Sequence, residues 1–302
     1  MKKLLLKLLD KEKYIKNKIL ANDKYWKNKY LHTIKPQIKK NKKVLKNKKV
    51  ISFLHSGQIG DIINSLATIK EISKKKICNL YIEINKPMPK DLYNLNKNYS
   101  NFFISRNVFD KLLPLLKFQK FLNHIEIYNN QKIDINLNLF REIYPNYNID
   151  SVRWYFHITG VHADLQKPYV SSPKLKKFKN CITIIRSKRR QNNLINYKFL
   201  NKFNNVFFLG LNDEYRDLKK QIKKLKFYDC KNFLELSMIL KNSKIFIGNL
   251  SFGYALAEAL KIPRLLESGP NFPLVYPNGH NAYDFYHQEH FEDLFQKIYG
   301  KN

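Results

Sequence analysis

Two glycines and one carboxylate stand together where an apolar segment of the chain ends. Residues 56–61 are Ser-Gly-Gln-Ile-Gly-Asp, and they follow the apolar segment Val50–His55. Glycines allow a sharp turn and let the backbone lie close to a ligand. A helix that begins at such a turn directs unpaired N–H groups and the positive end of its dipole at an anion. The segment predicts a ligand-binding turn with Asp61 at its rim, unless Asp61 serves only as a helix cap.

The residues around this turn predict a strand before it and a helix after it. Val50–His55 is rich in β-branched and aromatic side chains, which favours a strand. The apolar residues that follow the turn have helical spacing, and they are Ile62, Ile63, Leu66, Ile69 and Ile72. Further strands are predicted at residues 80–84 and 133–137, and a short helix at residues 151–161. These elements predict a βαβ-type first domain, which a Pro- and Lys-rich linker follows at residues 168–180.

A second α/β unit is predicted after the linker. Its strands are expected at residues 181–185, 206–209 and 245–247, and a helix at residues 254–260. The loops that follow the three strands begin at Arg186, Gly210 and Gly248. In open parallel sheets, ligands bind beyond the carboxyl ends of the strands, where these loops and the first glycine turn lie. The predicted fold class is α/β, with two Rossmann-like domains that face each other.

Length and composition agree with this division. A chain of 302 residues is long enough for about two domains, and 44% hydrophobic residues argue for folded cores. The predicted parts are an extension at residues 1–49, a first domain at 50–170 and a second domain at 171–302. The last helix of the chain is predicted to stay with the second domain or to return to the first.

The extension is strongly basic. Residues 1–49 contain 18 lysines and three acidic residues, which is about half of the formal net charge of +32. They are predicted to form one or two basic amphipathic helices. The apolar run at their start is shorter than the ~20 residues that span a bilayer, and no secretory cleavage site follows it, so the chain is expected to stay in the cytoplasm. The extension would lie on an anionic membrane surface, pack on the protein as an arm, or contact nucleic acid.

No metal site or resident cofactor is predicted. Cys78, Cys181 and Cys230 are far apart and lack the C-x-x-C spacing, so we expect buried thiols. The histidines His280, His287 and His290 form no H-E-x-x-H pattern, and the chain has no D-x-D motif that would hold a metal ion.

Residues 57–70 and 248–263, with Gly269-Pro270 after them, resemble the ADP-heptose heptosyltransferases of glycosyltransferase family 9, which have the GT-B fold. The chain is more similar to uncharacterised relatives of that family, in which one strand ends in Arg-Ser/Thr-x-Arg and a Gly-Asn-x-Ser loop precedes Ala-Glu-Ala/Gly-Leu-Lys-x-Pro. The match covers roughly residues 50–290. The resemblance implies a GT-B fold in which the first domain takes the acceptor and the second takes a nucleotide sugar.

The resemblance also implies roles for single residues. Asp61 occupies the position of the base that takes a proton from the acceptor hydroxyl. Because no metal-binding motif is present, cationic side chains and backbone N–H groups would neutralise the leaving diphosphate, and Arg186, Ser187 and Arg189 suit that role. The alternative for these three is an exposed basic turn.

Glu258 resembles the glutamate that binds the ribose of the nucleotide, although such a residue can also be a solvated helix residue. The other residues predicted to bind substrate are Gly57, Gln58, Gly60, Gly210, Asn249, Ser251, Phe252 and Gly253. Asn249 falls where heptosyltransferases carry an Asp, and Ala255 is nearest to the place of a family histidine. This departure leaves the donor sugar open.

These features predict a glycosyltransferase that acts in the cytoplasm, as a peripheral protein on the inner face of the membrane. It would move a sugar from a nucleoside-diphosphate sugar to a glycan or lipid-linked glycan in the assembly of cell-surface polysaccharide or lipopolysaccharide. The reaction would need no metal ion and would invert the anomeric carbon. The alternatives are a GT-B relative that binds nucleotide sugars without catalysis and a basic protein associated with nucleic acid.

Overall fold

Two parallel β-sheets form the body of the protein. The computed structural model describes residues 7–88, 101–142, 150–173, 175, 178–269 and 276–300. The first sheet has the strand order β3-β2-β1-β4, and the second has the order β10-β9-β8-β5-β6-β7. The strands of the first sheet are β1 (Val50–His55), β2 (Ile77–Ile82), β3 (His124–Ile127) and β4 (Ile135–Asn136). Those of the second are β5 (Ile182–Ile185), β6 (Val206–Phe208), β7 (Lys226–Phe227), β8 (Ile245–Asn249), β9 (Arg264–Glu267) and β10 (Ala282–Phe285).

Helices connect the parallel strands. In the first unit they are α4 (Ile59–Ser73), α6 (Arg106–Lys117) and α7 (Ser151–Thr159), with the 3-10 helix η3 (Leu137–Glu142). In the second unit they are α8 (Asn212–Lys219), α9 (Phe233–Asn242), α10 (Phe252–Leu260) and α11 (Gln288–Tyr299), with the 3-10 helices η4 (Lys188–Arg190) and η5 (Lys198–Lys202). Every residue of β5 is buried, because helices cover both faces of such a sheet.

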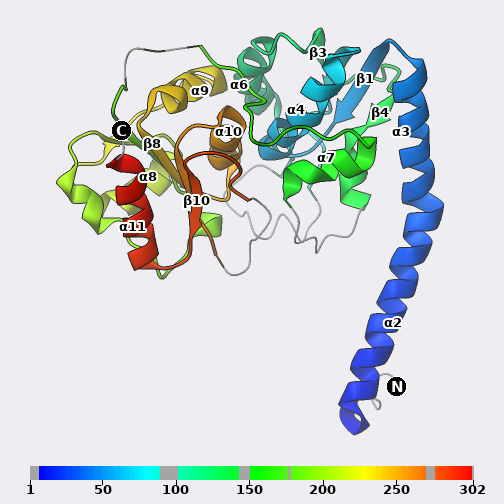
Figure 1. The fold of residues 1–302 in the computed structure, drawn as a ribbon, viewed down its shortest axis with the longest axis horizontal. Coiled ribbons are helices and arrows are strands. Elements are labelled where there is room, and N and C mark those ends of the chain that lie inside the picture. Colours follow the sequence, from blue (N-terminus) through cyan, green and yellow to red (C-terminus); the bar gives the residue numbers. More distant parts are fainter. Residues whose placement is uncertain are drawn as a thin grey trace.

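The two units meet along their helices. Figure 1 shows α4 and α6 of the first unit beside α9 and α10 of the second, and α4 contacts α10 while α6 contacts α9. One apolar core continues through this junction, from Ile63 and Leu66 of α4 to Leu256 and Ala259 of α10. The segment near the predicted boundary at residue 170 is also tied to α10, because the N–H groups of Tyr169 and Val170 donate to the carbonyl oxygen of Ala259.

The last helix packs on the second sheet. Phe291 and Phe295 of α11 are fully buried with Phe285 of β10, and the rings of Phe285 and Phe291 stack with centroids 4.0 Å apart. In the described part of the chain, α11 therefore stays with the C-terminal sheet and does not return to the first one.

The basic extension is a long helical rod. It consists of α2 (Lys11–Lys29), the π-helical turn η1 (Tyr30–Ile34) and α3 (Lys35–Asn47). Asn41 of α3 is buried, and its Nδ2 donates to the carbonyl oxygen of Ile158 in α7 at 3.1 Å. By contrast, no residue of α2 is buried, and Figure 1 shows α2 extending beyond the body of the protein. The prediction of a packed arm thus holds for α3 and fails for α2.

None of the helices among the described residues is both long enough and apolar enough to span a lipid bilayer.

Candidate functional site

The first glycine turn holds Asp61 by its backbone and by one cation. Gln58 is the N-cap of α4, and its N–H donates to Oδ2 of Asp61 at 3.0 Å. Asp61 is therefore not the N-cap itself; it is the third residue of the helix and reaches back to the cap, as in a capping box. The same Oδ2 accepts from the guanidinium of Arg141 at 2.9 Å. Both of these hydrogen bonds from described residues go to Oδ2.

Arg141 is a site residue that the sequence analysis missed. It lies in η3, just after the neighbouring strand β4, and its guanidinium lies 4.1 Å from the ring centroid of Phe103 and 4.6 Å from that of Phe140. These rings fix the cation beside Asp61, whose side chain is 22% exposed. The available signal was its position after a strand that pairs with β1, because parallel strands end at the same edge of a sheet.

Burial sets the protonation of this cluster. It raises the pKa of Asp61 above its usual range, while the Arg141 charge acts in the opposite direction. Burial also lowers the pKa of His55 to about 3, so the imidazole is neutral. A carboxylate with a raised pKa is a better base near neutral pH.

His55 and Tyr155 form hydrogen bonds to the backbone of the glycine turn. Nδ1 of His55 accepts from the N–H of Gly57 at 2.9 Å, so the proton of the neutral ring lies on Nε2, which is 2.9 Å from the hydroxyl of Tyr155. That hydroxyl donates to the backbone oxygen of Asp61 at 2.9 Å. A Cβ at residue 57 would lie 2.6 Å from the His55 ring and 2.8 Å from Asp61 Oδ2, so only glycine fits.

The second loop is built on a buried ion pair. Arg186 donates from Nε and a terminal nitrogen to both oxygens of Glu267, at 2.7 and 2.8 Å. Tyr197 adds a hydroxyl bond to the same carboxylate at 2.7 Å. Arg186 and Glu267 are nearly inaccessible. Arg186 is therefore bound to Glu267 beneath the loop, whereas the sequence predicts that it contacts a diphosphate.

Two hydrogen bonds made by the side chain of Asn249 connect the second and third loops. Its Oδ1 accepts from the N–H of Ser187 at 2.8 Å, and its Nδ2 donates to the carbonyl oxygen of Ser187 at 2.7 Å. Asn249 thus aligns the ends of β5 and β8. Arg189 lies in the short helix η4 and is partly exposed at the same edge.

The third loop places a helix N-terminus beside the first turn. Ser251 is the N-cap of α10, and its Oγ is buried without a hydrogen bond to any described residue. A Cβ at Gly60 would lie 3.8 Å from Ala255 Cβ and 3.9 Å from Phe252 Cα, so the first turns of α4 and α10 are neighbours. Two helix N-termini thereby converge, which favours an anionic ligand.

Gly253 and Gly210 serve close packing. A Cβ at Gly253 would lie 2.5 Å from Cδ1 of Ile185, and one at Gly210 would lie 2.8 Å from the ring of Phe208. Gly253 therefore lets the first turn of α10 pack tightly against β5, and Gly210 lets the loop after β6 lie against the ring of Phe208.

Glu258 is enclosed by cations. Its Oε2 accepts from Nε of Arg264 at 2.6 Å, and its Oε1 accepts from Nζ of Lys261. Arg264 is fully buried, and the side chains of Glu258 and Lys261 are each 7% exposed. Glu258 is the residue predicted to bind ribose, and both of its carboxylate oxygens are thus already bonded to cations of its own domain.

Asp150 lies beside this cluster, where a hollow of about 240 Å³ is lined by Asp150, Arg153, Tyr276 and Asn278. Nδ2 of Asn278 donates to Oδ2 of Asp150 at 3.0 Å. Burial, together with the nearby charge of Glu258, raises the pKa of Asp150 from 3.8 to about 6. The hydrogen bond links the first unit to the second at the price of a buried carboxylate.

We expect Asp150→Asn to stabilise the protein above about pH 6. Because the folded pKa is the higher one, the folded state binds more protons between 3.8 and about 6, and stability falls as pH rises through this window. The variant removes this loss, which amounts to at most roughly 3 kcal/mol. Urea unfolding of both proteins should give a difference that grows between about pH 4 and about pH 6 and is nearly constant at higher pH. Parallel pH curves would contradict the raised pKa.

Among the described residues, no group of three or more His, Cys, Asp or Glu side chains is placed to hold a metal ion. The structure brings together the first and third loops through Gly60 and Phe252, and the second and third through Asn249. Arg186 and Glu258 belong to buried ion pairs at the edges of this site. Pro270 of the resemblance lies outside the described residues.

Comparison with known proteins gives a fold. No protein-family model and no curated protein sequence matches the chain. The solved structure of the glycosyl transferase family 9 protein from Veillonella parvula DSM 2008 is similar with a TM-score of 0.52 and 10% identity, and the match covers 83% of this chain and 89% of that chain. The E. coli ADP-heptose LPS heptosyltransferase II gives a TM-score of 0.49 and 11% identity, over 84% of this chain and 99% of that one. The likeness to the Veillonella protein confirms the predicted GT-B fold.

Proposed function

We propose that the protein is a glycosyltransferase that moves a sugar from a nucleoside diphosphate to a glycan or lipid-linked glycan acceptor. The observation that carries this proposal is the Asp61 carboxylate, which Gln58 and Arg141 hold at the start of α4, beside the N-terminus of α10. A fold shared with a family 9 glycosyltransferase supports the assignment. Fold alone does not give function, and the placement of Asp61 at the two helix N-termini is the feature that supports transfer.

The chemistry follows from the two helix N-termini. Asp61 would take the proton of the acceptor hydroxyl, whose oxygen forms a bond to the anomeric carbon of the donor. The bond from that carbon to the diphosphate breaks, and the nucleoside diphosphate leaves with the electron pair. Attack opposite to the leaving group inverts the anomeric carbon. The first N–H groups of α10 would stabilise the diphosphate, since Arg186 is engaged by Glu267.

The reaction would take place at the membrane surface. An acceptor with a lipid anchor stays in the bilayer, so the enzyme would act as a peripheral protein on the inner face of the cytoplasmic membrane. Its products would be cell-surface polysaccharide or lipopolysaccharide. The similar E. coli structure is that of an LPS heptosyltransferase, whereas Asn249 and Ala255 leave the donor sugar of this chain open.

A panel of ADP-, GDP-, UDP- and CMP-sugars tests the proposal by thermal shift. Ligand at about 100 times its Kd adds about 2.7 kcal/mol of stability, which corresponds to a melting temperature several degrees higher. The stabilising donor should then be turned over in the presence of EDTA, because no metal ion is needed. If every donor leaves the melting temperature unchanged, the proposal fails. A strict requirement for Mg²⁺ or Mn²⁺ would contradict the metal-independent mechanism.

A relative that binds nucleotide sugars without catalysis is the second candidate, and the departures at Asn249 and Ala255 favour it. It would be stabilised by one donor and would show neither transfer nor hydrolysis of that donor.

A further inference from the structure

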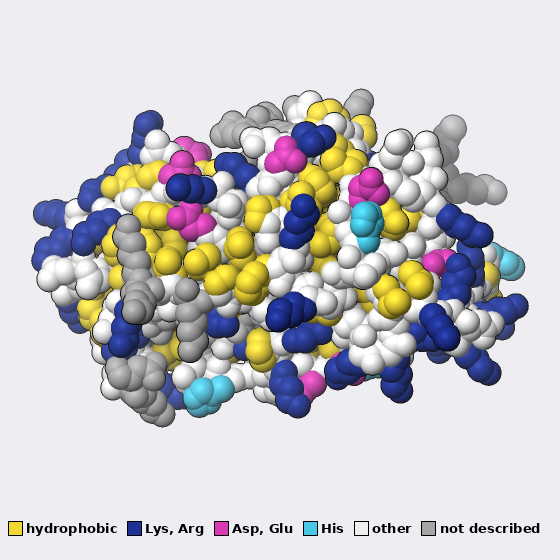
Figure 2. Space-filling model, turned by 90° about the horizontal axis from the view of Figure 1, so that it is seen from above, with side chains coloured by type: hydrophobic (Ala, Val, Ile, Leu, Met, Phe, Trp, Pro, Cys, Tyr) yellow, Lys and Arg dark blue, Asp and Glu magenta, His cyan; other side chains and the backbone are white. Residues whose placement is uncertain are grey.

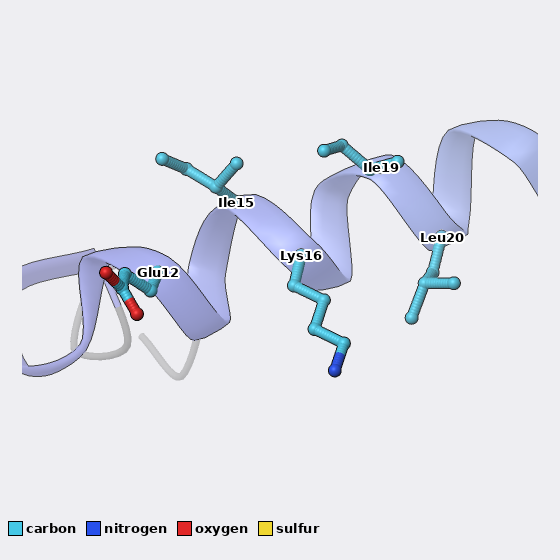
Figure 3. A pocket seen from close by; sticks show the side chains of 5 residues that line it. All are labelled: Glu12, Ile15, Lys16, Ile19 and Leu20. Atoms are coloured by element: carbon cyan, nitrogen blue, oxygen red, sulfur yellow. The ribbon is translucent and has the colours of Figure 1, made fainter.

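Helix α2 carries large apolar side chains that no described part of the protein covers. Leu8 and Leu9, just before the helix, are 79% and 78% exposed, and Ile15, Ile19 and Leu20 are 46%, 55% and 57% exposed. Figure 3 shows Ile15 and Ile19 on one side of the helix, with Lys16 and Leu20 on another. Single exposed apolar residues are normal, but a row over several turns marks an interaction surface.

Four of the apolar residues of α2 and η1 form a row on one face of the helix. Ile15, Ile19, Trp26 and Tyr30 are separated by four, seven and four residues, which places them on one face. Glu12 and Asp23 are the acidic residues of α2 and η1, and seven lysines of α2 surround them. Over α2 to α3, at residues 11–47, the sequence has 13 lysines and these two acids. Figure 2, seen from above, shows Lys and Arg side chains scattered over the molecule.

Charge and apolarity together select the partner. A second copy of the chain would bring an equally positive helix against this one, and like charges repel. Nucleic acid would bind the lysines and leave the leucines and isoleucines in water. A bilayer with anionic lipids accepts both, because its headgroups attract lysine and its interface takes up apolar side chains. Residues 2–9 of the sequence consist of lysine and leucine only, which extends the same composition.

We propose that α2, with the residues just before it, docks the protein on a bilayer that contains anionic lipids. The apolar face enters the headgroup region, and the flanking lysines contact lipid phosphates. Helix α3 transmits this position to the first unit, because Asn41 is hydrogen-bonded to Ile158 of α7. Docking would bring the first unit to a lipid-linked acceptor, and this consequence rests on the proposed function. Binding to the bilayer itself does not require sugar transfer.

Flotation of the full chain with vesicles is the experiment. Vesicles of phosphatidylcholine with phosphatidylglycerol are compared with vesicles of phosphatidylcholine alone. Lys16→Gln, Lys24→Gln and Lys27→Gln are combined in one variant, and Ile15→Asn with Ile19→Asn in another. The matched control combines Lys111→Gln, Lys117→Gln and Lys120→Gln, which removes the same charge from exposed positions of the body.

The wild type and the control should float with the anionic vesicles only. The triple α2 variant should bind on the order of 100-fold more weakly, because each lysine near an anionic surface contributes roughly a five-fold factor. The isoleucine variant should also lose binding while it keeps its charge. Trp26 supplies a second measurement: its fluorescence should shift to the blue with anionic vesicles, and Trp26→Phe should abolish the shift.

Three results would overturn the proposal. One is equal binding of the control and the triple α2 variant to anionic vesicles, which would show that the lysines of α2 contribute no more than lysines elsewhere on the protein. Another is a concentration-dependent dimer that the isoleucine variant abolishes, which would assign the face to a second copy. The third is binding to DNA that only the lysine variant weakens, with no binding to vesicles. Asp61→Asn should float like the wild type, so a failed transferase assay and a failed flotation assay remain distinguishable.

Discussion

Replacing Asp61 by Asn is expected to lower sugar transfer by at least about 100-fold, the low end for a general base, and to leave nucleotide binding nearly unchanged. The amide cannot take the proton of the acceptor hydroxyl. It still offers an oxygen to the N–H of Gln58, so the cap of α4 persists and the cost in stability should be about 1 kcal/mol or less. Turnover is measured with the donor that the thermal-shift panel identifies.

Asp110→Asn is the matched control. Asp110 is also paired with an arginine, since Nε of Arg106 donates to it at 3.0 Å, but it is 51% exposed on α6. This control should keep full turnover. An Asp61→Asn protein that retains most of its activity would remove Asp61 from the mechanism and leave it the role of a helix cap. Urea unfolding of both variants separates loss of chemistry from loss of fold.

The second large effect concerns stability. We expect Glu258→Ala to lower the free energy of unfolding by about 3–5 kcal/mol, because it leaves a buried cation without its partner. Arg264 is fully buried and donates to Glu258 at 2.6 Å, and Lys261 is nearly as inaccessible. Urea unfolding is the measurement, and Glu126→Ala, at an exposed carboxylate, should change stability by no more than about 0.5 kcal/mol.

A conservative variant tests the ribose role of Glu258 separately. Glu258→Gln keeps hydrogen-bonding oxygen at the site. If Glu258 acts through Arg264 and Lys261 alone, the variant should weaken a ribonucleoside diphosphate and its 2′,3′-dideoxy analogue by the same factor. A loss confined to the ribonucleotide in calorimetric titration would restore the predicted contact with ribose hydroxyls. A Glu258→Ala protein as stable as the wild type would instead show that the ion pairs carry no net stabilisation.

Local features were readable from the sequence because their causes are local. The strand Val50–His55 matches β1 residue for residue, and the helical spacing from Ile62 to Ile72 lies within α4. The predicted helix at residues 254–260 is α10, which begins two residues earlier at Phe252. Side-chain alternation and helical spacing report which face of an element meets the core, and they need no information about distant residues.

The partners of the site residues were decided by tertiary structure. Arg141 reaches Asp61 across 80 residues of sequence, and Glu267 reaches Arg186 across 81. A cationic side chain after a strand looks the same in the sequence whether it meets a ligand or a buried glutamate. Glu258 is an intermediate case: Lys261 lies one helical turn further along, a spacing that the sequence shows, whereas the bond from Arg264 of β9 depends on how α10 packs beside that strand.

The sequence by itself determined the strand-turn-helix order of β1 with α4 and of β8 with α10, the basic extension and the position of the glycine turns, but it did not predict the strands β3, β7, β9 and β10. Only the tertiary structure decided that α4 and α10 begin side by side, that α3 packs on α7 while α2 extends away, and that three predicted ligand residues, Arg186, Asn249 and Glu258, are bonded within the protein. The physical reason is that hydrogen bonds and ion pairs form between groups that the fold brings within about 3 Å, and spacing along the chain does not encode that distance.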